Sequence, residues 1–195
     1  AAHLSWSVGS VGPLILAIMV SWILWRYSAS WKAKPLVGNL SIAFLLGMVP
    51  LWLASLEASG AGPELQRDLL QNLGAYGAMA MAIGMVRELA KDAMDMEGDA
   101  AAKKSTFPLW KGENLTRRLC LVLWICVALM YAAGIQQWGG IEEWPSWIKW
   151  AAPFPGWAAC LFLLLQRNTR WKTLSRATLA TLILGIVQCA WIPGI

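Results

Sequence analysis

The chain has 195 residues, of which 58% are hydrophobic and only 14% carry a charge. Soluble domains average roughly 45–50% apolar and about 25% charged residues, so the composition excludes an ordinary soluble domain and indicates a membrane protein. The net charge of +5 does not indicate a nucleic-acid partner, because the basic residues are spread over separate connections and form no single basic face. The length suits one domain, residues 1–195.

Six apolar runs follow one another along the chain and predict six membrane-spanning α-helices. They are residues 11–25, 36–56, 69–86, 119–135, 150–165 and 177–192. Several are shorter than the roughly 20 residues that a spanning helix needs. Tryptophan, tyrosine, lysine and arginine side chains at their ends can anchor at the membrane interface and so extend each helix. The expected fold class is therefore an all-α, polytopic transmembrane bundle.

The connections between these runs alternate in charge. The first, third and fifth connections hold fourteen of the sixteen Lys and Arg residues, whereas the second and fourth together hold two. Basic connections of membrane proteins stay on the cytoplasmic side. We therefore expect a multi-pass protein of the cell inner membrane, with the odd connections in the cytoplasm and both ends of this chain outside.

Other residues that often carry chemistry predict no separate site. The four cysteines lie in apolar runs without a C-x-x-C spacing, so we expect reduced, buried thiols. His3 is the only histidine, which excludes a metal site built from several histidines. Segment 136–149 is typical of an amphipathic stretch on the outer membrane surface. Pro153 and Pro155 are expected to start or kink the fifth helix.

The connection between the third and fourth runs, residues 87–108, is rich in carboxylates. If the third helix continues to Asp99, then Glu88, Asp92, Asp95 and Asp99 lie within about 60° on one helix face. Like charges spaced three and four residues apart repel each other, so the arrangement favours a bound cation. The alternative is a solvated cytoplasmic loop with no ligand.

Two features favour the bound cation. The third run contains small residues that permit close helix packing beside the acidic face. These are Gly74, Gly77, Ala78, Ala80, Ala82 and Gly84. In addition, carboxylates suit Mg²⁺, which prefers a few of them together with water and phosphate oxygens. At a membrane the phosphorylated ligand expected is a lipid such as an isoprenyl diphosphate, whose departing diphosphate a metal and nearby Lys or Arg would stabilise.

The pattern Arg87-Glu88-x-x-Lys91-Asp92-x-x-Asp95-x-x-Gly98-Asp99, followed by Lys104-x-Thr106-x-Pro108, is specific. It resembles the second aspartate motif of the UbiA-type intramembrane prenyltransferases, closest to the branch that includes digeranylgeranylglyceryl phosphate synthase. The stretch Tyr27-Ser28…Lys32…Pro35-Leu36-x-Gly38-Asn39 is similar to the segment before the family's fifth helix.

This resemblance implies roles for individual residues. Asp92, Asp95 and Asp99 would be the catalytic aspartates that bind Mg²⁺. The residues that would contact the diphosphate are Lys91, Lys32, Tyr27, Arg87 and Asn39. Arg87 lies about 140° from Asp92 around a helix, and pairing with a lipid headgroup is an equal alternative for it. Lys103 stands where the family often carries glycine.

The resemblance also implies a reaction and its partners. The protein would transfer a prenyl group, with Mg²⁺, from an isoprenyl diphosphate to a glycerol phosphate-type lipid or an aromatic acceptor. Membrane lipids would be its other partners, and nucleic acid would not be one. The oligomeric state stays open.

One part of the family's pattern is missing from this sequence. The family has nine helices and a first motif, Asn-Asp-x-x-Asp-x-x-x-Asp, which does not occur here. The resemblance therefore implies the C-terminal six helices of a nine-helix fold, an N-terminally incomplete member that is inactive alone.

The alternative to an enzyme is a non-catalytic membrane protein or a pseudoenzyme fragment. A transporter is disfavoured, because its spans should carry polar or charged residues near their middles. A CDP-alcohol phosphotransferase requires Asp-Gly followed by Ala-Arg, whereas Asp95 is followed by Met96-Glu97.

Overall fold

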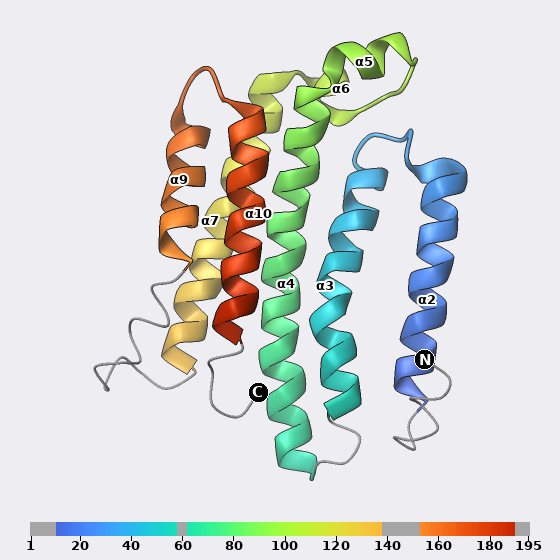
Figure 1. Ribbon diagram of the computed structural model, residues 1–195, viewed down its shortest axis with the longest axis vertical. Coiled ribbons are helices and arrows are strands. Elements are labelled where there is room, and N and C mark those ends of the chain that lie inside the picture. The colour runs from blue at the N-terminus through green and yellow to red at the C-terminus, as the bar shows by residue number, and fades with distance from the viewer. Residues whose placement is uncertain (1–10, 58–61, 138–152, 190–195) are drawn as a thin grey trace. The chain divides into compact units, whose positions relative to one another are not determined.

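A computed structural model describes residues 11–57, 62–137 and 153–189 of the chain. Within these ranges all regular structure is helical (Figure 1). In chain order the helices are α2 (Gly12–Arg26), η1 (Tyr27–Trp31), α3 (Val37–Glu57), α4 (Pro63–Met94), α5 (Met96–Ala101), α6 (Phe107–Lys111), α7 (Glu113–Gln137), α9 (Phe154–Leu165) and α10 (Trp171–Cys189). Each of the six predicted apolar runs corresponds to one of the longer helices, which confirms the all-α fold class.

The helices differ in how well they fit a membrane span. Four stretches are long and apolar enough to cross a bilayer: Gly12–Trp31, Val37–Leu56, Pro63–Met94 and Glu113–Gly134. In the same part of the chain, α9 is apolar but has only 12 residues. Helix α10 begins six residues before the predicted run and so includes Lys172 and Arg176 in its first turns. By length and hydropathy, α2 with η1, α3, α4 and α7 therefore fit a membrane span best.

The chain forms two compact units, Ala1–Met81 and Ala82–Ile195. We call these the first unit and the second unit and describe each by itself. The first unit contains α2, η1, α3 and the beginning of α4. The second contains the end of α4 and all later helices.

In the first unit, α3 and α4 approach until their backbones touch. A Cβ atom added to Gly77 would lie 2.5 Å from the carbonyl oxygen of Gly47, and one added to Gly47 would lie 2.8 Å from that of Gly77. Elsewhere on the same pair of helices, Ala54 packs with Leu69 and Leu73. The close packing predicted for the small residues of the third run is confirmed at Gly77.

In the second unit, two side chains of α7 bind backbone carbonyl groups of α9 and its end. The buried Trp124 donates from Nε1 to the carbonyl oxygen of Trp157 at 3.1 Å. Arg117 donates from one guanidinium nitrogen to the carbonyl oxygens of Leu164 and Gln166, at 3.4 and 3.2 Å. Because the last carbonyl groups of a helix have no partner within it, Arg117 supplies a cap for α9.

The start of α9 follows the prediction made from its prolines. Pro153 is the N-cap, and Pro155 lies in the first turn, where a missing N–H removes no helical hydrogen bond. The helix packs closely on α10, since a Cβ added to Gly156 would lie 2.5 Å from Oγ1 of Thr181. Both prolines therefore start the helix and do not kink it.

The cysteines are free thiols, as predicted, at Cys120, Cys126 and Cys160. Cys120 and Cys160 are buried, but the prediction of burial is wrong for Cys126, which lies on the outward face of α7. An apolar thiol is tolerated there because that face of a spanning helix meets lipid. His3 and most of segment 136–149 lie outside the described residues.

Candidate functional site

The carboxylates of the acidic connection are divided between two helices. Glu88 and Asp92 lie on α4, which ends at Met94, whereas Asp99 lies on α5. Asp95 stands between them with φ −100° and ψ 14°, outside the helical region. The expected single helix through Asp99 is therefore wrong.

Electrostatics gives a physical reason for this break. A continuous helix would stack four like charges three and four residues apart. Starting a new helix at Met96 places Glu97 and Asp99 in a first turn, where the helix dipole favours negative charge. Asp95 becomes the N-cap, without a side-chain hydrogen bond to the first turn.

The three aspartates differ in exposure but act on the same cation. Asp99 is buried, with 6% of its surface exposed, whereas Asp92 is half-buried and Asp95 is exposed. The ammonium of Lys104 donates to Oδ1 of Asp99 at 2.8 Å. The hydrogen bond and charge of Asp99, and the charges of Asp92 and Asp95, raise the pKa of Lys104. The three carboxylates therefore create one region that attracts positive charge.

This donor set fits one side of a Mg²⁺ site. Among the residues that the structure describes, no three His, Cys, Asp or Glu side chains converge closely enough to form a complete metal cage. Mg²⁺ seldom needs such a cage, because it keeps several waters and takes one or two carboxylates plus phosphate oxygens. Lys104 lies where a cation is attracted, and Asp99 offers a buried carboxylate oxygen there.

Lys104 was not among the residues predicted to form the site. It follows Asp99 by five residues, and its backbone N–H donates to the carbonyl oxygen of Asp99 at 2.9 Å. Lys103 before it has φ 53°, in the left-handed region that favours glycine. Only the tight turn, which the sequence does not reveal, brings Lys104 back to Asp99.

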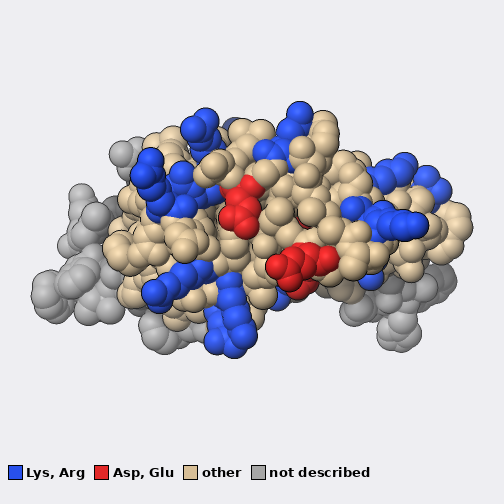
Figure 2. All heavy atoms as spheres, turned by 90° about the horizontal axis from the view of Figure 1, so that it is seen from above, with Lys and Arg blue, Asp and Glu red and all other residues tan. Residues whose placement is uncertain are grey.

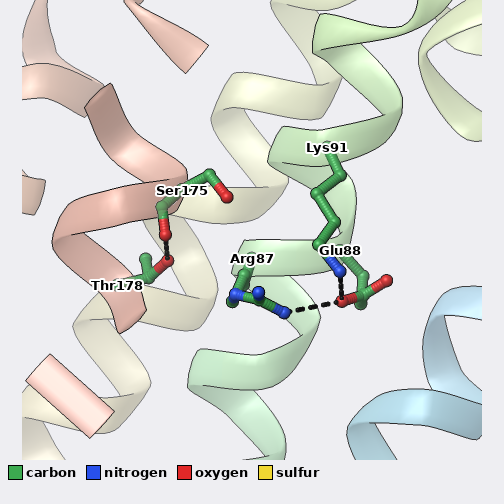
Figure 3. Close-up of polar contacts among 5 residues, drawn as sticks. All are labelled: Arg87, Glu88, Lys91, Ser175 and Thr178. Atoms are coloured by element: carbon green, nitrogen blue, oxygen red, sulfur yellow. Dashed lines mark hydrogen bonds and ion pairs between the residues drawn. The ribbon is translucent and has the colours of Figure 1, made fainter. Parts of the chain in front are cut away.

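Arg87, Glu88 and Lys91 form a second charged group on α4 (Figure 3). The carboxylate of Glu88 accepts from Lys91 at 2.5 Å and from Arg87 at 3.2 Å. Its side chain is only 13% exposed, against 25% for Arg87 and 40% for Lys91. The predicted ligand Lys91 is thus held toward Glu88, and its ammonium retains two further donors.

Tyr27, Lys32 and Asn39, the other predicted ligands, lie in the first unit around η1. This element is a π-helical turn, in which the backbone N–H of Lys32 donates to the carbonyl oxygen of Tyr27 at 3.1 Å. Asn39 is buried in the first turn of α3, and the neighbouring Gly38 packs on the Lys32 backbone. The structure therefore brings these three residues together at one junction.

The basic connections of the second unit lie at one end of it. The connection from α4 to α7 and the one from α9 to α10 are both at the upper end in Figure 1. Figure 2 looks onto this end and shows many Lys and Arg side chains with smaller acidic patches. The grouping of charge at a helix-bundle end agrees with the alternation seen in the sequence.

The sequence pattern of the UbiA prenyltransferase family matches residues 1–182. This chain belongs to the UbiA prenyltransferase family. The resemblance inferred from the aspartate motif is thereby confirmed. UbiA proteins are integral membrane proteins, and the four helices long enough to span a bilayer fit that class.

Curated relatives of this UbiA chain include archaeal enzymes named digeranylgeranylglyceryl phosphate synthase. The protein of Methanopyrus kandleri is 34% identical over 109 residues, which cover 56% of this chain and 36% of the relative. That of Methanoculleus marisnigri is 37% identical over 103 residues, covering 53% and 34%. That of Methanosarcina mazei is 37% identical over 106 residues, covering 54% and 34%.

The UbiA chain thus aligns over about a third of the length of the curated relatives it matches. No solved structure matches it significantly. The predicted site residues of this UbiA chain fall into two groups: Tyr27, Lys32 and Asn39 in the first unit, and Arg87, Lys91 and the three aspartates in the second.

Proposed function

We propose that the protein containing this chain transfers a prenyl group from an isoprenyl diphosphate to a glycerol phosphate-type lipid within the membrane, with Mg²⁺. The observation that carries the proposal is the buried motif carboxylate of Asp99, which binds the ammonium of Lys104 at 2.8 Å, in a member of a prenyltransferase family. The names of the archaeal relatives support the glycerol phosphate-type acceptor.

The roles of the residues follow from their charge. Asp92, Asp95 and Asp99 would hold Mg²⁺, with Asp99 as the buried ligand. When bound, Mg²⁺ would supply positive charge to the departing diphosphate. Lys32 and Tyr27 would donate hydrogen bonds to diphosphate oxygens, and Asn39 would support the η1 junction. These donors hold the leaving group where its charge develops.

The transfer needs no reactant other than the isoprenyl diphosphate and the acceptor lipid. The carbon–oxygen bond between the prenyl group and the diphosphate breaks, and the diphosphate leaves with the bonding electrons. An acceptor hydroxyl oxygen forms the new bond to the allylic carbon, and its proton passes to the departing diphosphate or to water. In the proposed topology the aspartates and the basic connections face the cytoplasm, where water-soluble diphosphate is released.

The experiment compares Asp95→Asn and Asp99→Asn with wild type in the full-length protein. Transfer of a labelled prenyl group to a lipid acceptor in the presence of Mg²⁺ should fall about 100-fold or more in each variant, because a charged ligand is replaced by a neutral one. Glu97→Gln is the matched control, since Glu97 is an exposed acid on the same turn. Undiminished transfer by both aspartate variants would show that the aspartates are not metal ligands.

A further inference from the structure

We propose that Arg87 and Lys91 of α4, together with Ser175 of α10, form a second anion site that holds the phosphate of the acceptor lipid. The inference deepens the proposed function and rests on it for the identity of the lipid. It moves Arg87 and Lys91 from the predicted diphosphate group to the acceptor, and for Arg87 this is the alternative that its place on the helix had left open.

Arg87 has binding capacity that its one ion pair does not use. A single guanidinium nitrogen donates to Glu88, at 3.2 Å. Its Nε is buried and has no hydrogen-bond partner within the described chain. A buried donor without a partner is unfavourable, so a ligand that accepts from Nε would recover that free energy.

The charge around Arg87 favours an anion. Glu88 accepts from both Arg87 and Lys91, so one carboxylate is shared by two cations and the group keeps one positive charge in excess. Charged residues within a spanning helix are costly and usually serve a function. A phosphate ligand would balance the excess charge.

A neighbouring helix supplies a further donor. Figure 3 shows Ser175 and Thr178 on the side of α10 that is turned toward α4, with the Ser175 hydroxyl directed toward it. The buried Thr178 hydroxyl donates to the carbonyl oxygen of Ser175 at 2.9 Å and is therefore engaged within its own helix. Ser175 is only half-buried, and its hydroxyl can donate to a ligand between the two helices.

The location of Arg87 separates this site from the aspartates. Arg87 precedes the end of α4 at Met94 by seven residues, or about 10 Å along the helix axis. It also lies about 140° around the helix from Asp92. An anion bound at Arg87 would therefore lie at the bilayer interface. The headgroup of a lipid reaches this position more readily than a free ion in water does.

The hydrogen-bond donors and charge of this site favour a phosphate monoester over a phosphate diester. The planar guanidinium group offers parallel N–H donors that match phosphate oxygens, and Lys91 adds a point charge. A monoester phosphate carries more negative charge and one more free oxygen than the diester of an ordinary phospholipid. The site would therefore hold the acceptor at a fixed depth and distinguish it from bulk lipid.

The experiment measures binding of fluorescent phosphatidic acid, a phosphate monoester lipid, to full-length protein in phosphatidylcholine nanodiscs without Mg²⁺ or isoprenyl diphosphate. Arg87→Gln should weaken binding about tenfold and Ser175→Ala about threefold, as expected for loss of charged and neutral hydrogen bonds. Arg176→Gln is the matched control, because Arg176 is exposed beside Ser175, and it should change binding less than twofold.

Arg87→Lys is a second variant that should fold like the wild type, because lysine retains the charge that pairs with Glu88. It should still weaken binding about fivefold, since the buried Nε donor is lost. Binding within twofold of wild type in both Arg87 variants would overturn the proposal. So would displacement of the lipid by an equal concentration of inorganic phosphate, which would identify a soluble anion as the occupant.

Steady-state kinetics separate this inference from the proposed function. If both hold, Arg87→Gln raises the acceptor KM about tenfold and leaves the KM for the isoprenyl diphosphate unchanged. An increase in the donor KM alone would return Arg87 to the diphosphate site and refute the inference. If wild type binds the lipid through Arg87 but transfers no prenyl group, the anion site stands and the proposed function fails.

Discussion

The backbone N–H of Lys32 donates to the carbonyl oxygen of Tyr27 across five residues, at 3.1 Å. In an α-helix residues five apart point about 140° away from each other. The wider π-helical turn instead returns the chain to the same side after five residues, and such turns are frequent at functional sites. Tyr27 and Lys32 can therefore act on one ligand.

Lys32→Gln tests that pairing. In the full-length protein, we expect the KM for the isoprenyl diphosphate to rise about tenfold, the effect of losing one charge-assisted hydrogen bond. Lys34→Gln is the matched control, because Lys34 is equally exposed and two residues away. Equal changes in the two variants would indicate a general effect of surface charge and would remove Lys32 from the site.

The ion pair between Lys104 and Asp99 makes a prediction about metal binding. Lys104 donates to an oxygen that Mg²⁺ would need, so the ammonium competes with the metal. Lys104→Gln should tighten apparent Mg²⁺ binding about fivefold to tenfold, because one nearby positive charge is removed. Melting of the detergent-solubilised protein, titrated with Mg²⁺ after treatment with EDTA, measures this affinity.

The control for Lys104 is Lys172→Gln, which removes an exposed charge on α10. It should leave the apparent Mg²⁺ affinity within twofold of wild type. Weaker Mg²⁺ binding by Lys104→Gln would show that Lys104 supports the metal site and does not compete for it.

The contact between Gly47 and Gly77 makes a prediction about stability. Gly77→Ala would place a methyl group 2.5 Å from the carbonyl oxygen of Gly47, so α3 and α4 must separate. Overpacking of this kind lowers stability by roughly 1–3 kcal/mol. Gly74→Ala is the control, since its new Cβ would meet only Leu51 at an ordinary 3.8 Å. Thermal melting should show a loss in Gly77→Ala alone, and an equal loss in both would argue against the close contact.

The cap that Arg117 provides for α9 can be tested in the same way. Arg117→Gln removes the charged donor to the carbonyl groups of Leu164 and Gln166, which should lower stability by roughly 1–3 kcal/mol. The adjacent Arg118 is exposed, and Arg118→Gln should have little effect. Hydrogen exchange at the end of α9 measures the local change. Unchanged exchange in Arg117→Gln would mean that water replaces the arginine.

The positions of the long helices could be predicted from sequence, because membrane helices are specified by contiguous apolar residues. Each apolar run from residue 11 onward corresponds to a helix, and Pro153 and Pro155 start α9 as expected. The small residue Gly77 could likewise be assigned to close packing. These features depend on local composition, which can be read from the sequence alone.

The arrangement of the carboxylates could not be predicted in the same way. The motif identified Asp92, Asp95 and Asp99, but a helical projection assumes an unbroken helix and so placed them on one face. Repulsion between the carboxylates and the dipole of a new helix favour a break at Asp95 instead. Lys104 joins the aspartates only because Lys103 adopts a left-handed turn.

The sequence by itself determined the class of protein, its helices and the residues of the aspartate motif, since apolar length and motif spacing are local properties. The tertiary structure decided which side chains meet. A π-helical turn joins the backbones of Tyr27 and Lys32, and Ser175 lies on the side of α10 that is turned toward the helix carrying Arg87. Such contacts join residues by hydrogen bonding and packing across turns and helices, which no periodicity along one segment encodes.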